Sequence, residues 1–368
     1  MASGLNVELL KRLCQTPGVP GREDRVRELI IKEVKGLFDE IRTDAMGNLL
    51  CKRNPRSGKG KTAGSRGGKG SASKGEATRV MLPCHMDQIG FLVRHVDDKG
   101  FVRLNAVGGF DTRTLFARPV TVCTKKGDIP GVMNPGGRPI HIATDEDRKK
   151  VPDIKEIVVD IGMDGKKAKE TVAIGDMVVL DAPFTEMGNK IVSKCLDNRV
   201  ACWLGIESVR ALEKSGAAHS CEVHVAFTVQ EEVGLRGAKT AAAAIAPHIA
   251  IGLDVSLSCD TPGVPEDEMV TKQGDGVGLH VMDSSFIADA SLIDELEEVA
   301  KKKKIPHQRT ILMRGGQDGA AGQQTGIGAR AAGVVVGTRY IHSITEMLDK
   351  RDLAAARDLL AAWIPTVK

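Results

Sequence analysis

The fold of this chain is decided by the stretch VHVAFTVQEEVG, residues 223–234, in which an apolar run ends in two adjacent carboxylates. The run 223–229 is rich in β-branched residues and predicts a buried strand. Two neighbouring glutamates at the end of such a strand repel each other and lose hydration unless a positive charge lies beside them. An isolated Glu-Glu pair is usually a solvated surface feature. The meaning of Glu231 and Glu232 therefore depends on the residues at the ends of the neighbouring strands.

Four further apolar runs are followed by a histidine or an aspartate. The runs 80–84, 191–195, 249–253 and 334–340 predict strands, and they precede His85, Asp197, Asp254 and His342. Sites in open α/β sheets form beyond the carboxyl ends of the strands, so these side chains and the glutamate pair are expected at one edge. Two histidines and several carboxylates provide the mixed nitrogen and oxygen ligation of borderline-hard cations. The sequence thus predicts two divalent metal ions per subunit, zinc or cobalt, with manganese as a further candidate.

Spacing suggests how the site is oriented. Asp87 lies two residues after His85, so both side chains project the same way from an extended segment. The Asp87 carboxylate is expected to accept the second ring N–H of His85, which would orient the imidazole and raise its basicity. A metal centre would also explain the glutamate pair, with one carboxylate as a ligand and the other as a proton-accepting base.

Bulk composition favours a two-domain globular chain. Its 368 residues are 42% hydrophobic and 27% charged, and that length exceeds what one hydrophobic core usually holds. No apolar run approaches the roughly 20 residues that span a bilayer, and the N-terminal residues do not resemble a secretory signal. Eight cysteines without a C-x-x-C pair favour reduced thiols. We therefore expect a cytoplasmic protein without a membrane partner.

Element patterning divides the chain into two kinds of structure. Short β-like runs with Gly and Pro between them fill residues 90–180 and predict a small β-barrel or sandwich. After residue 190, apolar runs alternate with helical patterns, which predicts an α/β domain. Helices are expected at 5–14, 23–38, 198–214, 237–246, 285–303 and 352–364.

One basic segment dominates the charge of the chain. Residues 52–78 carry a net charge of +7, so the remaining residues carry −3. The part from about 54 to 77 is rich in Gly, Ser and Lys, and we interpret it as a disordered insertion in a β-hairpin formed by the runs 48–51 and 79–84. It is either a tolerated hairpin expansion or an electrostatic tether to nucleic acid or an acidic protein.

Motifs along nearly the whole chain resemble the tetrahedral metallo-aminopeptidases, a dinuclear family that includes glutamyl and deblocking aminopeptidases. The matching stretches include LLKRLC (9–14), HMDQIGF (85–91), PIHI (139–142), LDNR (196–199), VQEEVG (229–234) and RYIHS (339–343). The resemblance implies that one metal ion is held by His85, Asp197 and Asp254. Asp197 would bridge to a second ion, whose other ligands would be Glu232 and His342. Glu231 would be the general base. Asp87, from its spacing to His85, is expected to serve catalysis without binding metal.

The resemblance also implies an architecture and an activity. A mixed-sheet, zinc-peptidase-like catalytic domain would comprise residues 1–89 and 181–368, with a PDZ-like β-barrel of residues 90–180 inserted for dimerisation. Dimers of the family assemble into a hollow twelve-subunit tetrahedron, so a homo-oligomer is expected. The implied reaction is metal-dependent removal of N-terminal residues from peptides with a free N-terminus.

The chain departs from the family pattern at two places. Gly315-Gly316-Gln317-Asp318-Gly319 stands where the family usually has Gly-Gly-Thr-Asp-Ala, near the expected substrate side, and Gln88 replaces a common Glu. Two alternatives to the peptidase are a glucanase and a non-catalytic assembly that binds nucleic acid or acidic protein through residues 52–78. The glucanase fits poorly, because glycoside hydrolysis uses two carboxyl groups about 5–9.5 Å apart across a bond and ordinarily no metal pair.

Overall fold

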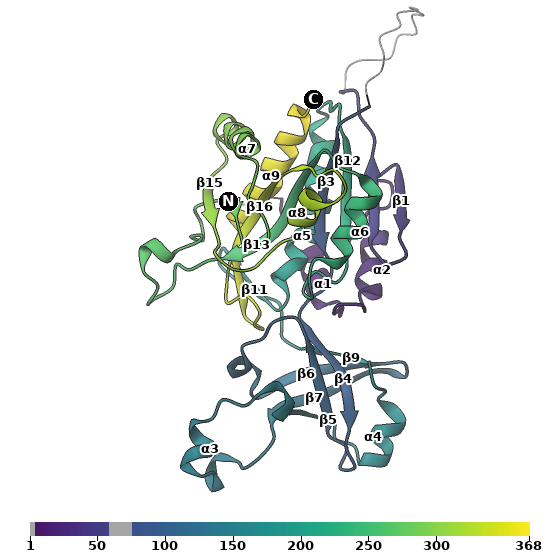
Figure 1. The fold of residues 1–368 in the computed structure, drawn as a ribbon, viewed down its shortest axis with the longest axis vertical. Coiled ribbons are helices and arrows are strands. Elements are labelled where there is room, and N and C mark those ends of the chain that lie inside the picture. The colour runs from purple at the N-terminus through teal and green to yellow at the C-terminus, as the bar shows by residue number, and fades with distance from the viewer. Residues whose placement is uncertain (1–3, 59–75) are drawn as a thin grey trace, which may run out of the picture.

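The computed structural model of the protein describes residues 4–58 and 76–368, which form an α/β lobe and a smaller β-barrel lobe (Figure 1). Among these residues the α/β lobe contains an eleven-stranded mixed sheet. Its strands lie in the order β1 (Glu40–Thr43), β2 (Leu49–Arg53), β12 (Glu222–Thr228), β3 (Arg79–His85), β13 (Ile249–Leu257), β16 (Arg330–Arg339), β17 (Glu346–Asp349), β11 (Lys190–Ser193) and β10 (Thr185–Met187). β14 (Val277–Met282) pairs with β16, and β15 (His307–Ile311) pairs with β14.

The centre of the sheet is parallel. β12, β3, β13 and β16 run in the same direction. β17 is antiparallel to both β16 and β11, so β11 shares the direction of β16. Strands buried on both faces need nearly continuous apolar sequence, and β12 supplies it with the consecutive residues Val225, Ala226 and Phe227, which are all buried. The carboxyl ends of five strands therefore meet at one edge.

Helices cover both faces of the sheet. One face packs against α1 (Val7–Gln15), α2 (Asp24–Glu33), α5 (Leu196–Ser215), α7 (Ala290–Lys303) and α9 (Lys350–Trp363). The other packs against α6 (Arg236–Ile245) and α8 (Gly319–Gln324). Successive strand residues point to opposite faces, so Leu49 packs on the first side and Leu50 on the second.

The second lobe is a closed six-stranded barrel, which confirms the small barrel expected for this region. Its order is β4 (Gly90–Val96), β5 (Val102–Val107), β8 (Ile157–Asp160), β7 (Gly127–Pro135), β6 (Arg118–Thr124) and β9 (Met177–Leu180), which returns to β4. Neighbouring strands are antiparallel. Phe91, Leu104 and Val122 are among the side chains that fill its interior. Two short helices, α3 (Asp145–Lys149) and α4 (Gly165–Thr171), lie outside it (Figure 1).

The expected β-hairpin around the basic insertion is wrong. β2 pairs antiparallel with β12, and β12 pairs parallel with β3, so β12 lies between the two strands that were expected to pair. Residues 59–75, which include most of the insertion, lie outside the described residues. Two expected helices are also shorter than their patterns suggested, because α2 ends at Glu33 and α7 begins only at Ala290, after its N-cap Asp289.

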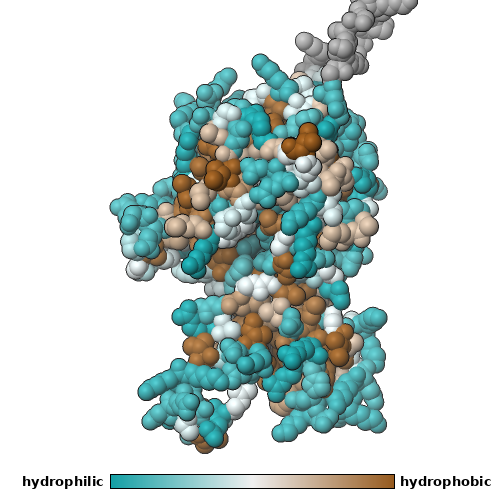
Figure 2. Space-filling view, viewed as in Figure 1, coloured by the Kyte–Doolittle hydropathy of each residue, from teal (hydrophilic) through white to brown (hydrophobic). Residues whose placement is uncertain are grey.

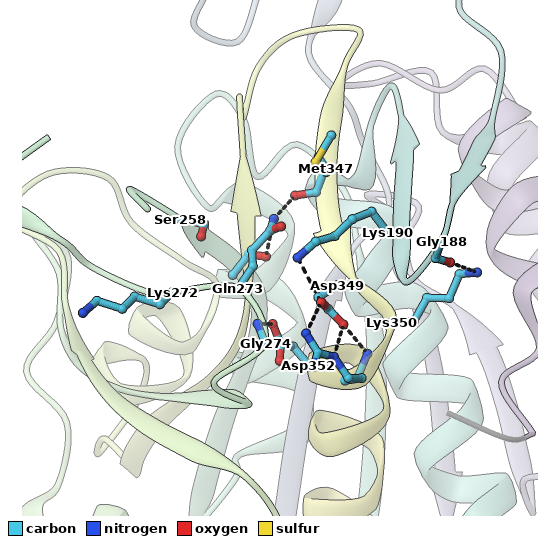
Figure 3. Close-up of polar contacts among 12 residues, drawn as sticks. Gly188, Lys190, Ser258, Lys272, Gln273, Gly274, Met347, Asp349, Lys350 and Asp352 are labelled. Carbon is cyan, nitrogen blue, oxygen red and sulfur yellow. Dashed lines mark hydrogen bonds and ion pairs between the residues drawn. The ribbon is translucent and has the colours of Figure 1, made fainter. Parts of the chain in front are cut away.

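A buried polar network fixes β17 and the start of α9 (Figure 3). Asp349 accepts a bond from Lys190 Nζ at 2.9 Å and from the Arg351 N–H at 2.8 Å, which caps α9. Asp352 accepts the N–H groups of Gly274 and Gly276 at 2.7 and 2.9 Å. Burial raises the pKa of Asp352 to about 6. At Asp349 burial acts in the same direction, but the bonds from Arg351 and Lys190 outweigh it and lower the pKa to about 2.

No helix in the part of the chain that the structure describes is long and apolar enough to cross a membrane.

Candidate metal centre

The carboxyl edge of the parallel strands carries a cavity of about 570 Å³ near the junction of the two lobes. Figure 2 shows a hollow in the viewed face near the junction of the two lobes. Six of the seven residues expected at the site line the cavity: His85, Asp197, Glu231, Glu232, Asp254 and His342. The seventh, Asp87, is fully buried behind them. Two overlapping groups have ligand atoms within 4.8 Å of one another, His85 with Glu231 and Asp254, and His85 with Asp197 and Glu232.

The sheet explains why residues from distant parts of the chain meet here. His85 is the last residue of β3, and Glu231 and Glu232 follow β12. Asp197 lies in the first turn after β11. Asp254 was expected just after a strand but lies inside β13, because that strand continues to Leu257 by pairing with β16. Its side chain nevertheless reaches the same cavity.

Asp197 lies between two imidazoles. Its Oδ1 is 3.3 Å from His85 Nε2, and its Oδ2 is 3.4 Å from His342 Nε2. Glu232 Oε2 is also 3.4 Å from His342 Nε2. On the other side, Glu231 Oε2 is 3.7 Å from His85 Nε2. His85 is therefore common to the two groups of possible ligand atoms, and Asp197 lies between His85 and His342.

The charge balance of this cluster favours cations. Burial raises the pKa of Glu231, Glu232 and Asp254 well above the usual range, and repulsion between neighbouring carboxylates adds to the effect. Burial also acts to raise the pKa of Asp197, but hydrogen bonds from His342 and His85 lower it overall. Within the described residues, the buried Glu232 Oε1 has no hydrogen-bond partner. Buried carboxylates that lack sufficient positive charge are a donor set suited to divalent metal ions.

The Asp87 carboxylate makes other hydrogen bonds than the one expected with the His85 ring. The His85 Nδ1 atom lies 3.1 Å from the backbone carbonyl of Asp87 and 3.5 Å from its Oδ1. The carboxylate instead accepts the backbone N–H of Glu231 through Oδ1 and that of Glu232 through Oδ2, each at 3.1 Å. Asp87 therefore orients the ring through its main chain and holds the glutamate segment through its side chain.

Sequence reasoning missed Glu346. Its Oε2 accepts the N–H of Asp197 at 3.0 Å, and its Oε1 accepts the N–H of His342 at 2.8 Å. Glu346 is buried, and burial together with the charge of Asp197 raises its pKa well above the usual range. It belongs to β17, a strand that the sequence pattern did not predict. A lone glutamate four residues after a histidine carries no signal by which the sequence could have identified it.

The loop with the unusual Gly315–Gly319 sequence contributes in an unexpected way. Gly315 and Gly316 line the cavity, whereas Gln317 is buried against the sheet, where a Cβ on Gly252 would meet its Oε1 at 1.8 Å. The loop expected near the substrate side therefore reaches the cavity through Gly315 and Gly316, while its Gln317 packs into the sheet. Asp318 is buried and accepts a bond from Thr228 Oγ1. Burial raises the pKa of Asp318 to about 6.

The rest of the cavity is mainly apolar. Among the described residues that line it outside the histidine and carboxylate cluster, Arg314 alone is positively charged. The apolar wall is formed by Leu235, Val255, Leu257, Leu312 and Ile341. A metal centre beside an apolar cleft can hold a reacting group at one end and a substrate side chain at the other.

Three backbone conformations at the centre are strained. Cys195, Gln230 and His342 have positive φ angles of 47°, 56° and 65°. A non-glycine residue in this conformation costs about 1–3 kcal/mol, and residues of this kind concentrate at functional sites. They lie at or next to the segments that carry Asp197, Glu231 and His342.

The chain is similar to known aminopeptidases over most of its length. A family model described as M42 glutamyl aminopeptidase matches residues 68–359. The lysyl aminopeptidase of Pyrococcus furiosus is 31% identical over 369 residues, which cover 98% of this chain and 97% of that protein.

Solved structures give the same relationship. The TET aminopeptidase from a marine sediment Thaumarchaeota archaeon superimposes with a TM-score of 0.89 at 29% identity, covering 98% of this chain and 96% of that one. The Pyrococcus horikoshii TET1 peptidase, which can assemble into a tetrahedron or a large octahedral shell, has a TM-score of 0.82 and 31% identity, covering 97% of this chain and 98% of that one.

Proposed function

The chain belongs to the M42 glutamyl aminopeptidase family, and from that premise we propose that it removes N-terminal residues from peptides with two divalent metal ions and Glu231 as the general base. Membership makes it a metal-dependent aminopeptidase. The two-ion centre and the residue roles are the part we propose. The observation that carries them is Asp197, whose two oxygens face His85 and His342 at 3.3 and 3.4 Å.

The donor set supports this assignment. We assign His85, Asp197 and Asp254 to one ion, and Asp197, Glu232 and His342 to the other. The free Glu232 Oε1 atom and the raised carboxylate pKa values support it, because both indicate a cluster that lacks positive charge. The ions would be zinc or cobalt, with manganese as a further candidate. Bound here, they would polarise the scissile carbonyl and lower the pKa of water.

The protein's own groups then handle binding and protons. The acidic cluster attracts the free N-terminal amine of a peptide, so substrates with blocked N-termini are expected to be poor. The Glu231 carboxylate accepts a proton from the attacking water and returns it to the departing amine, a function that contributes about 10²–10⁴ in rate. Burial raises the pKa of Glu231, which suits a group that must both take and release a proton.

A substrate panel tests the proposal. The purified protein is stripped of metal, reloaded separately with zinc, cobalt or manganese, and assayed on aminoacyl chromogenic substrates and on one peptide with a free or an acetylated N-terminus. We expect activity to vanish on stripping, to return with metal, and to require the free N-terminus. Undiminished cleavage after stripping, or equal cleavage of the acetylated peptide, would contradict the proposal.

The geometry gives little support to a glucanase. Glu231 and Glu232 are consecutive in sequence, and each lies beside a histidine. Glycoside hydrolysis instead places two carboxyl groups about 5–9.5 Å apart on opposite sides of a bond. The binding role considered for residues 52–78 concerns a segment that lies mostly outside the described residues. We therefore retain the peptidase alone.

We further propose that the chain forms a homo-oligomer in the cytoplasm. Residues 1–89 and 181–368 would form the catalytic domain, and the PDZ-like barrel of residues 90–180 would make dimers that assemble into a dodecamer. Exposed Ile140, Ile142 and Ile174 on the barrel lobe supply apolar surface for such contacts. All eight cysteines are free, as suits a reducing compartment. Sedimentation analysis would measure the assembly, and a monomer at micromolar concentration would contradict it.

A further inference from the structure

The backbone beyond β12 is held by buried side chains rather than by a neighbouring strand. After Thr228, four consecutive N–H groups each donate to a side-chain oxygen. The bonds are Val229 to Asn48 Oδ1 at 3.0 Å, Gln230 to Glu23 Oε1 at 3.0 Å, and Glu231 and Glu232 to the two Asp87 oxygens at 3.1 Å. The three acceptors are all buried. They come from three separate parts of the chain and meet only at this segment.

Glu23 is the least expected of these acceptors. It occupies the N-cap position of α2, where a carboxylate ordinarily bonds to the first amides of its own helix. Its side chain makes no such bond. Instead its Oε1 accepts the N–H of Gly21 at 2.8 Å and that of Gln230 at 3.0 Å. A capping role therefore does not explain why this carboxylate is buried.

The contact acts on the residue directly before the proposed base. Gln230 has a left-handed backbone with φ of 56°, so the chain turns sharply there and leaves the sheet. A conformation of this kind persists only where its surroundings hold it. The direction in which Glu231 projects depends on this turn. A displacement of about 1 Å at a reacting group can cost about 10²-fold in rate.

We propose that Glu23 is a positioning residue for the general base, holding the Gln230 amide and thereby the backbone from which Glu231 reaches the cavity. The inference rests on the proposed function, because it presupposes that Glu231 is the base. Glu23 does not line the cavity, so it acts only through the main chain.

The geometry allows a test of whether Glu23 acts as a hydrogen-bond acceptor or through its charge. One oxygen of Glu23, Oε1, accepts both amide bonds. Glutamine keeps an acceptor oxygen at that position, whereas alanine removes it. Burial and the nearby Asp87 charge raise the pKa of Glu23 to about 7, so a neutral side chain is well suited to this environment. Glu23→Gln should therefore work where Glu23→Ala fails.

Asn48 belongs to the same arrangement but is a less selective probe. Its Nδ2 donates to Asp44 Oδ2 at 2.6 Å and to the Gly237 carbonyl at 3.0 Å, besides the bond that Oδ1 accepts from Val229. Replacing it would disturb the 44–48 turn and α6 together. Among the described residues, the Glu23 side chain is hydrogen-bonded only to Gly21 in its own turn and to Gln230, so its substitution tests positioning more cleanly.

The test compares Glu23→Gln, Glu23→Asp and Glu23→Ala with Glu28→Ala, an exposed position on the same helix. Each full-length protein is loaded with metal, and kcat, KM, metal content and the thermal unfolding midpoint are measured on one aminoacyl chromogenic substrate. We expect Glu23→Ala to lower kcat at least about tenfold, with KM and metal content near wild type. Glu23→Gln and Glu28→Ala should stay within about threefold of the wild-type kcat.

Each outcome of this test either supports or overturns the positioning role of Glu23. A Glu23→Ala protein with the wild-type kcat would overturn the proposal, and so would a Glu23→Gln protein as impaired as Glu23→Ala. If Glu23→Ala does not fold, Glu23→Asp replaces it, since the shorter side chain withdraws the acceptor oxygen but keeps the charge. A wild-type protein without metal-dependent cleavage would refute the proposed function itself, which is a separate outcome.

Discussion

The side-chain carboxylate of Glu346 holds the main chain of Asp197, because Glu346 Oε2 accepts the Asp197 N–H at 3.0 Å. The other oxygen of the same carboxylate accepts the N–H of His342 at 2.8 Å. One buried side chain therefore ties together the two segments that carry Asp197, the proposed bridging ligand, and His342, a proposed ligand. Groups that orient ligands without touching the metal commonly affect metal affinity 10–100-fold (about 1–3 kcal/mol).

Replacing Glu346 by glutamine should weaken metal binding. Both oxygens of Glu346 accept an N–H, so the new NH₂ group must oppose one backbone donor. This contrasts with Glu23, where a single oxygen accepts both bonds. We expect metal affinity to fall about 10–100-fold, measured by competition with a chromogenic chelator. Glu268→Gln, at an exposed position, is the matched control, and unchanged affinity in Glu346→Gln would refute the orienting role.

The substitution Glu231→Gln distinguishes the role of general base from the role of metal ligand at position 231. Glu231 lies within ligand distance in the group with His85 and Asp254, but as a base it need not bind metal. We expect kcat to fall by about 10²–10⁴-fold while the metal content of the purified protein, measured by mass spectrometry, stays at the wild-type value. Loss of one equivalent of metal would instead identify Glu231 as a ligand.

Asp197→Ala should lower the occupancy of both metal positions together. Asp197 is the carboxylate that faces both His85 and His342, so its removal takes a donor from each position. Asp254→Ala, by contrast, should reduce only the position near His85. The measurement is metal content after equilibration at a fixed free zinc concentration. Full occupancy in Asp197→Ala would exclude it as the bridge.

Stabilisation by metal should grow as the pH rises. Burial raises the pKa of Glu231, Glu232 and Asp254. For His85, burial acts in the opposite direction, but the surrounding carboxylates outweigh it and raise its pKa as well. At a pH above the pKa values that these groups have in the unfolded chain, the folded metal-stripped protein therefore binds more protons than the unfolded chain. Its free energy of unfolding then falls as the pH increases. Metal replaces those protons.

The rise in thermal unfolding midpoint on adding zinc should therefore be larger at pH 8 than at pH 5. Differential scanning fluorimetry at a fixed free zinc concentration measures it. The control is Asp197→Ala, in which the pH dependence of the zinc effect should be reduced. An equal or larger rise at pH 5 would contradict the charge balance described for the centre.

Local sequence was sufficient for much of the site. His85, Asp197 and Glu232 were predicted because each follows an apolar run that ends in a polar side chain, and strand direction then brings such ends together. The barrel could also be predicted, since short runs with Gly and Pro between them are a local signal. The roles of the predicted residues remain predictions until the variants above are measured.

Pairing across long distances was not predictable in this way. The hairpin expected from strands β2 and β3 is wrong because β12, more than a hundred residues later, inserts between them. The loop 315–319 was expected near the substrate side, and Gly315 and Gly316 line the cavity, but the motif did not show that Gln317 packs against Gly252 of the sheet. In both cases the deciding partner lies outside any local window of sequence.

The sequence by itself determined which chemistry we propose for this protein, because the types of the proposed ligand and base residues are set by the residue identities at the ends of apolar runs. Only the tertiary structure decided how that chemistry is held in place. Glu23 meets Gln230 across 207 residues, and Glu346 meets Asp197 across 149. Backbone N–H groups exist at every residue except proline, so no side-chain pattern can indicate which of them a buried carboxylate will hold until the chain has folded.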